Sequence, residues 1–182
     1  SVLLASALMM SMAACGSKTE TNTNDAQNTQ TESDVLRVGM ECNYAPYNWS
    51  QADNSNDAIA IANVDNMFTN GYDVQVAKKI ADSMGKKLEI YSYEWDSLIP
   101  GVQSGKLDMI IAGMSPTAER REKIDFSDNY YTSNLVVITK KGNLSDVKSI
   151  ADLKDKKIAA QSGTFHLDAL TEQTEAQVNE LA

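Results

Sequence analysis

Apolar and polar residues change period along residues 34–182, and the changes mark the expected elements. Apolar and polar residues alternate along Val35–Met40 and predict a strand. Apolar residues then recur at helical spacing from Val76 to Met84 and predict a helix that Asp73 caps and Gly85 ends. More strands are expected at Leu88–Tyr93, Leu107–Ala112, Leu135–Thr139 and Ile158–Ala160, and helical segments at Asp96–Ser104, Ile150–Leu153 and from Leu167 onward. Strands thus alternate with helices, which predicts an α/β fold with a mainly parallel sheet.

Two regions interrupt this alternation. Residues 43–65 are polar and read as a loop, with only a short strand expected at Ile59–Ala62. Residues 140–143 follow a predicted strand and precede a new strand and helix, so they are interpreted as a boundary. The unit after this boundary is expected to stay incomplete up to Ala182.

The residues after each predicted strand are the candidate ligand contacts. In parallel α/β sheets, ligands bind beyond the carboxyl ends of the strands. Four segments occupy such places, namely Glu41–Tyr47, Glu94–Asp96, Gly113–Thr117 and Gln161–Phe165.

Arg120 follows the third of these strands and is the candidate carboxylate partner. Its guanidinium offers a rigid fork of donors that matches a carboxylate. Ser115 adds a hydroxyl, and the backbone N–H groups of Gly113–Ser115 are expected to face the same anion. The alternative is that Arg120, beside Arg121, is one charge on an exposed helix.

Aromatic and acidic residues at other strand ends extend this candidate site. Tyr44 and Trp95 can sandwich an aliphatic or cationic side chain, although packing in the core or at its rim explains them equally. Glu41 can meet an amino group or a polar or basic side chain, or it is a solvated loop acid. Ser162–Thr164 precedes a helix, so it is either a second anion-facing loop or an ordinary helix cap.

Catalysis finds little support in these residues. His166 is the single histidine, and its place beside a helix start favours a structural role. Asp125 and Asp128 are interpreted as turn and capping residues rather than an acid–base pair. We therefore name no catalytic residue.

The first 33 residues predict export and a lipid anchor. Residues 1–14 are apolar but shorter than the roughly 20 residues of a membrane span, and they fit the end of an export signal. Met12–Cys15 resembles a bacterial lipobox, in which Cys15 becomes lipidated; a buried core helix is the alternative. Residues 16–33 are almost free of apolar side chains and are expected to form a disordered tether.

Charge and composition narrow the classes of partner. The formal net charge of −9 and the scattered basic residues argue against nucleic-acid binding. With Cys15 lipidated, Cys42 has no partner for a disulfide. One histidine and one further cysteine are too few for a typical zinc site, so no metal or cofactor is expected.

Several longer stretches together resemble the bacterial extracellular solute-binding proteins of family 3, the amino-acid-binding components of ABC importers. They are VGMECNYAPY, NGYDVQVAKKIA, IADLKDKKIAAQSGTF and the specific central run EWDSLIPGVQSGKLDMIIAGMSPTAERREKIDFSDNYY. The resemblance implies the type 2 periplasmic-binding-protein fold, two α/β lobes joined by a hinge. Lobe 1 is then residues 34–139, the hinge 140–143, and an incomplete lobe 2 residues 144–182.

The resemblance also implies roles for individual residues. Arg120 would bind the ligand α-carboxylate, with Gly113 and Ser115 beside it. Tyr44 and Trp95 would stack on the ligand, and Glu41 would occupy the acidic or polar position after the first strand. The lobe 2 contacts would be Gln161, Thr164 and Phe165. The acid that binds the α-amino group would lie beyond Ala182, so these 182 residues alone are expected to bind weakly or not at all.

The predicted function is a monomeric, lipid-anchored binding protein outside the bacterial cell membrane. It would deliver a free polar or basic amino acid to an ABC permease with a cytoplasmic ATPase, without catalysing a reaction. Two alternatives stay open. One is an enzyme like cyclohexadienyl dehydratase, which has a related fold, and the other is the sensory ectodomain of a receptor.

Overall fold

The computed structural model describes residues 34–181 of the chain. The predicted export signal, its Cys15 and the tether at 16–33 lie outside the described residues. Within the described part, no helix has the length and apolar character needed to cross a membrane.

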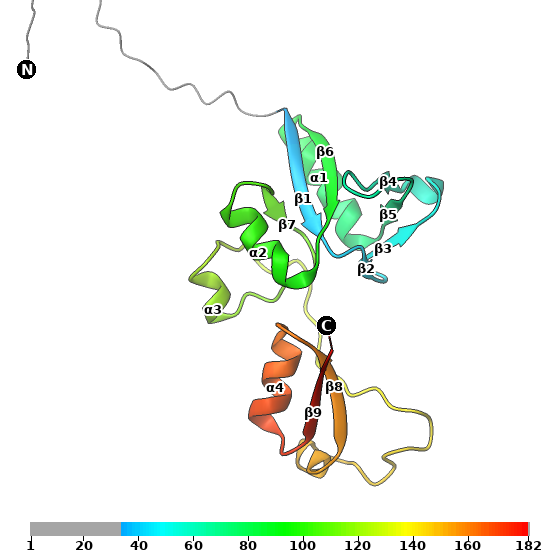
Figure 1. Ribbon diagram of the computed structural model, residues 1–182, viewed down its shortest axis with the longest axis vertical. Helices are drawn as coiled ribbons and strands as arrows, with labels where there is room; N and C mark the ends of the chain where they lie inside the picture. Colours follow the sequence, from blue (N-terminus) through cyan, green and yellow to red (C-terminus); the bar gives the residue numbers. More distant parts are fainter. Residues whose placement is uncertain (1–33, 182) are drawn as a thin grey trace, which may run out of the picture. The chain divides into compact units, whose positions relative to one another are not determined.

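A three-stranded parallel sheet forms the centre of the first part of the described chain (Figure 1). β1 (Val35–Met40) lies between β6 (Lys87–Ser92) and β7 (Met109–Ile110) and runs parallel to both. Leu36, Val38 and Met40 of β1 are buried, which explains the alternation in the sequence. The predicted parallel sheet is confirmed, but β7 is shorter than the expected Leu107–Ala112 because it pairs only with Val38 and Gly39.

Two helices accompany this sheet. α1 (Tyr72–Met84) ends at Gly85 as predicted, with Gly85 in the left-handed conformation. The predicted cap at its start is wrong, since Gly71 occupies the N-cap and Asp73 lies buried in the first turn. α2 (Trp95–Gln103) buries Leu98 in the core that it shares with β1.

Residues 43–70 form a second, antiparallel sheet, so the loop predicted at 43–65 is wrong except for the short strand expected at Ile59–Ala62, where β4 lies. Its order is β2 (Asn43–Tyr44), β3 (Asn48–Gln51), β5 (Phe68–Asn70) and β4 (Ile59–Ala60), with the 3-10 turn η1 (Ser55–Asp57) before β4. The strands are two to four residues long and largely polar, so their sequences lack the apolar alternation that identifies a strand.

Residues after the boundary form a strand–helix–strand unit. The helical turn η2 (Ile150–Leu153), β8 (Lys157–Gln161) and α4 (Phe165–Gln173) match expectation, but the predicted helix does not continue to the end. Thr174 is extended, and β9 (Gln177–Leu181) pairs in parallel with β8, beside α4 in Figure 1. Val178 of β9 is half-buried, and the other four residues of the strand are exposed.

The predicted strand at Leu135–Thr139 is wrong. This segment follows the short helix α3 (Ala118–Arg121) and has no ladder partner among the described residues. Val136 and Ile138 are 76% and 91% exposed. β-branched composition alone therefore does not produce a strand where no neighbouring strand supplies hydrogen bonds.

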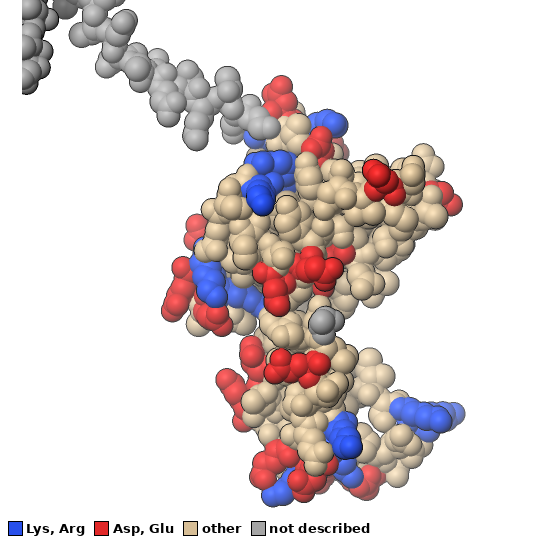
Figure 2. Space-filling model, viewed as in Figure 1, with Lys and Arg blue, Asp and Glu red and all other residues tan. Residues whose placement is uncertain are grey.

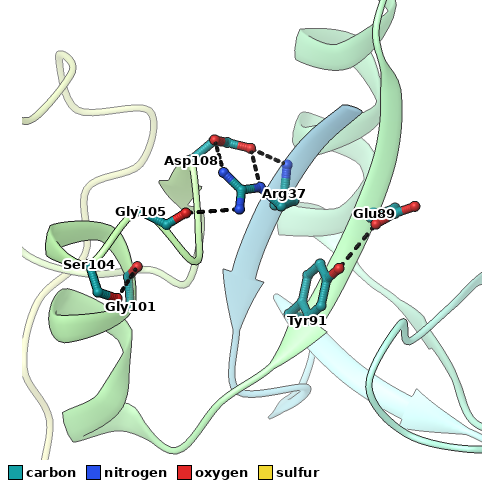
Figure 3. Close-up of polar contacts among 7 residues, drawn as sticks. All are labelled: Arg37, Glu89, Tyr91, Gly101, Ser104, Gly105 and Asp108. Carbon is teal, nitrogen blue, oxygen red and sulfur yellow. Dashed lines mark hydrogen bonds and ion pairs between the residues drawn. The ribbon is translucent and has the colours of Figure 1, made fainter. Parts of the chain in front are cut away.

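A side-chain clasp ties β1 to the turn before β7 (Figure 3). The Arg37 guanidinium donates to both carboxylate oxygens of Asp108, at 3.0 and 2.7 Å, and to the carbonyl of Gly105 at 2.8 Å. Asp108 also accepts from the backbone N–H of Arg37 at 2.8 Å. These bonds hold the pKa of Asp108 below its ordinary value.

Candidate functional site

One cavity brings together the residues that the sequence analysis selected. Its volume is about 50 Å³, and it is partly open to solvent. All nine predicted ligand contacts line it, joined by two residues that were not predicted. The predicted residues are Glu41, Tyr44, Trp95, Gly113, Ser115, Arg120, Gln161, Thr164 and Phe165, and the additional ones are Ala112 and His166. Their role in binding a ligand remains a prediction.

Arg120 is buried against this cavity, which excludes its reading as one more charge on an exposed helix. Thr117 caps α3 and accepts a hydrogen bond from the Arg120 backbone N–H, so the side chain is held at the end of a defined turn. Arg120 is only 8% exposed, and burial lowers its pKa. Its guanidinium carbon lies 5.2 Å from the centre of the Trp95 ring, a cation–π distance.

The contacts of the Arg120 guanidinium are neutral. Nη1 donates to the Ser115 carbonyl at 2.8 Å, and Nη2 donates to the Gly163 carbonyl at 3.0 Å. Asp168 and Glu119 raise its pKa through space, against the effect of burial. No carboxylate in the described part of the chain forms an ion pair with Arg120.

The Gly113 loop differs in one respect from expectation. Gly113 has a φ of +62°, in the left-handed region that favours glycine. Its backbone N–H donates to the Tyr130 hydroxyl at 3.0 Å, so it does not face an anion as predicted. A Cβ placed here would lie 3.4 Å from the Tyr44 ring, so the glycine allows that ring to approach the loop.

Side chains after β1 and β8 meet across the cavity. Gln161 donates from Nε2 to Glu41 Oε1 at 2.9 Å. Trp95 donates from its indole N–H to the Gly163 carbonyl at 2.9 Å. Thr164 is buried, and its hydroxyl donates to the Gln161 carbonyl at 2.7 Å, which fixes the turn that leads into α4.

His166 is a cavity residue that the sequence analysis assigned to structure alone. Its ring lies 4.9 Å from that of Phe165, in the first turn of α4. Partial desolvation and the positive charge of Arg120 lower its pKa, which favours the neutral imidazole. Its position directly after Phe165 could have identified His166 as a cavity residue, because both residues follow the end of a strand.

Comparisons with known proteins identify the family of this chain. Residues 36–180 match the profile of bacterial extracellular solute-binding proteins, family 3. The chain belongs to this family. It is 30% identical over 164 residues to the arginine-binding extracellular protein ArtP of Bacillus subtilis, covering 90% of this chain and 55% of ArtP. It is 34% identical over 185 residues to the L-cystine-binding protein TcyA of the same organism, covering 97% of this chain and 63% of TcyA.

A solved structure gives the same result for the fold of this family 3 chain. The ancestral amino acid-binding protein AncCDT-1, described as a precursor of cyclohexadienyl dehydratase, is 34% identical with a TM-score of 0.71. The match covers 81% of this chain and 61% of AncCDT-1. The predicted α/β fold of the type 2 periplasmic binding proteins is therefore confirmed. The chain spans about three fifths of the length of the relatives it matches.

The charged surface of this family 3 protein is mixed. On the face shown in Figure 2, acidic and basic side chains are interspersed over both parts of the described chain. Among residues 34–181, no group of three or more His, Cys, Asp or Glu side chains is placed to hold a metal ion.

Proposed function

We propose that this chain is the substrate-binding component of an ABC importer and that it binds a free amino acid. The buried guanidinium of Arg120 carries this proposal. It has two neutral carbonyl partners and no carboxylate partner within residues 34–181. Burying a charge without a counter-charge is costly, and a ligand α-carboxylate would supply the missing charge.

The rest of the cavity suits the remainder of an amino acid. Tyr44 and Trp95 provide aromatic walls, and Phe165 closes the lobe 2 side. Glu41 would bind a basic or polar ligand group after exchanging its hydrogen bond with Gln161. The relatives named for arginine and cystine support an amino-acid ligand, and Glu41 favours a basic or polar one. No group in the cavity is assigned a catalytic role.

Delivery to a permease follows from the proposed lobes and anchor. Lobe 1 (34–139) and lobe 2 (144–182) would close about residues 140–143, and the permease would recognise the closed state. The protein would act as a monomer outside the cell membrane, held by a lipid on Cys15. An ABC permease with its cytoplasmic ATPase is the expected partner.

Thermal unfolding with each standard L-amino acid tests the binding function, on protein expressed from its complete reading frame. A ligand at one hundred times its Kd adds about 2.7 kcal/mol of stability, which gives a measurable rise in Tm. Arg120→Ala should abolish this rise, because losing one partner of a buried charged pair costs about 2 to 5 kcal/mol.

Arg121→Ala is the matched control, since Arg121 is exposed and its guanidinium carbon lies 5.5 Å from the Phe126 ring centre, outside the cavity. An unchanged Tm rise in Arg120→Ala would refute the assignment of Arg120 as the partner of the ligand carboxylate. Turnover of prephenate or arogenate by the wild-type protein would instead establish the dehydratase function.

The anchor has a separate test. Cys15→Ala should leave the protein in the soluble fraction of cells, whereas the wild type should fractionate with membranes and incorporate labelled palmitate. Equal membrane association of both proteins would exclude Cys15 as the lipidation site.

A further inference from the structure

Two of the turns that carry ligand contacts share an unusual backbone conformation. Cys42, between Glu41 and Tyr44, has a φ of +58°, and Gly113, before Ser115, has a φ of +62°. Left-handed conformations are unfavourable for residues with a Cβ, so the turn at Cys42 needs support from its surroundings.

The backbone N–H groups of both turns donate into one chain of hydrogen bonds. Cys42 N–H donates to Asn48 Oδ1 at 2.8 Å, and Asn48 Nδ2 donates to Asp73 Oδ2 at 2.7 Å. From the other side, Gly113 N–H donates to the Tyr130 hydroxyl at 3.0 Å, and that hydroxyl donates to Asp73 Oδ1 at 3.3 Å. Both branches end on the carboxylate of Asp73.

The direction of every bond in this chain is fixed. A backbone N–H can only donate, so Asn48 must present its oxygen to Cys42 and its amide hydrogens to Asp73. The Tyr130 oxygen accepts from Gly113, which leaves its hydrogen for Asp73. Asp73 is therefore an acceptor at both oxygens, the role that an ionised carboxylate fills.

Burial makes this arrangement costly to disturb. Asp73 is 0% exposed and Asn48 is 1% exposed, so water cannot replace a lost partner. Asp73 lies in the first turn of α1, where the helix dipole favours a negative charge. Burial still raises its pKa, against the hydrogen bonds from Asn48 and Tyr130. Asp73 is not one of the residues that line the cavity.

We infer that Asp73 is a positioning residue for the ligand site, holding the Cys42 turn through Asn48 and the Gly113 turn through Tyr130. It thereby sets the spacing between Glu41 and Tyr44 on one turn and Ser115 on the other. The assignment of these turns to ligand binding rests on the proposed function, but the hydrogen-bond chain itself does not.

Amide hydrogen exchange followed by NMR tests the positioning role in the full chain without ligand. Tyr130→Phe removes the hydroxyl and keeps the ring, so Gly113 should exchange about five to ten times faster, the factor that one hydrogen bond provides. Cys42 should be unaffected. Asp73→Asn places a donor where two donors already meet, so the Cys42 and Gly113 amides should both exchange faster.

Tyr91→Phe is the matched control, because it also removes one tyrosine hydroxyl bond, to Glu89, on a strand outside the cavity. It should leave both turns unchanged. Equal acceleration across β1 and β6 in Tyr130→Phe would show a general loss of stability and overturn the inference. Unchanged exchange at Gly113 would overturn it as well.

Calorimetry with L-arginine and the other standard L-amino acids then separates this inference from the proposed function. Tyr130→Phe should weaken binding about fivefold to tenfold, whereas Tyr91→Phe should bind as tightly as the wild type. If the exchange pattern is as expected but the wild type binds no amino acid, the proposed function is wrong. The conclusion that Asp73 holds the Cys42 and Gly113 turns is then still supported. If Tyr130→Phe binds as tightly as the wild type, Asp73 does not position the ligand site.

Discussion

Two adjacent arginines show how strongly position decides the role of a residue. Arg120 is buried against the cavity, whereas Arg121 is exposed and lies over the Phe126 ring. Spacing alone did not separate the two. The turn capped by Thr117 does, because it directs residue 120 rather than residue 121 toward the Ser115 carbonyl.

His166 provides a direct measure of the charge at the cavity. It is the only histidine in the chain, so its imidazole NMR signals need no assignment. Partial desolvation and the Arg120 charge lower its pKa, so its titration midpoint should lie below the ordinary value of about 6.5. Arg120→Ala should move that midpoint upward, since it removes the repulsion.

Arg121→Ala should leave the His166 midpoint unchanged, which distinguishes the local effect from a change in net charge. A wild-type midpoint at or above the ordinary histidine value would contradict the placement of His166 beside Arg120.

At the scale of the elements, the Arg37–Asp108 clasp makes the pairing of β1 and β7 dependent on pH. The folded pKa of Asp108 lies below its unfolded value because Arg37 donates hydrogen bonds to its carboxylate. The resulting stabilisation is therefore present above the ordinary carboxyl pKa of about 4 and is lost as pH falls through the depressed folded value. Both side chains are 33% exposed, so solvent limits the contribution to about 1 kcal/mol.

Urea unfolding of the wild type and Asp108→Asn tests this dependence. The difference in free energy of unfolding should be full at pH 6 and should shrink below pH 4. In an Arg37→Gln background, Asp108→Asn should have little further effect. A difference that is independent of pH would show that packing, rather than the ion pair, supports this junction.

The long elements of the fold could be predicted from the sequence because their apolar periods reflect burial. β1, α1, β6, α2 and β8 were placed to within about two residues, a normal error at element ends. Apart from β4, the antiparallel sheet at residues 43–70 was not predicted, because its strands are only two to four residues long and carry polar side chains, of which Asn48, Thr69 and Asn70 are buried. The predicted strand at Leu135–Thr139 was wrong for the opposite reason, because it has the composition of a strand but no partner strand among residues 34–181.

The candidate site could be located from the strand ends and the family resemblance, but its internal contacts could not. Nothing in local sequence pairs Asp73 with Tyr130, which lies 57 positions further along. The bond between Gln161 and Glu41 spans 120 positions. Such bonds result from tertiary packing, and the spacing of apolar residues along the sequence does not predict them.

At the scale of the molecule, Trp95 is placed to report the closing motion proposed above. It donates to Gly163 and lies beside Arg120, whereas Trp49, the second tryptophan, lies on β3 outside the cavity lining. Binding of an amino acid should therefore change the fluorescence of Trp95 alone. A fluorescence titration should give the same change in Trp49→Phe as in the wild type.

Trp95→Phe should lose the fluorescence change while calorimetry still detects weakened binding. A full change in Trp95→Phe would place the reporter at Trp49 and argue against closure at this cavity.

The carbonyl of Gly163 accepts hydrogen bonds from both Trp95 and Arg120, and a carbonyl of the main chain is the same whatever amino acid a gene encodes. Mutations that replace the side chains at 161 and 165 would leave this acceptor in place, whereas Thr164 fixes the turn that presents it. Residues 161 and 165, which are proposed to contact the ligand, can thus diverge without loss of the contact across the cavity.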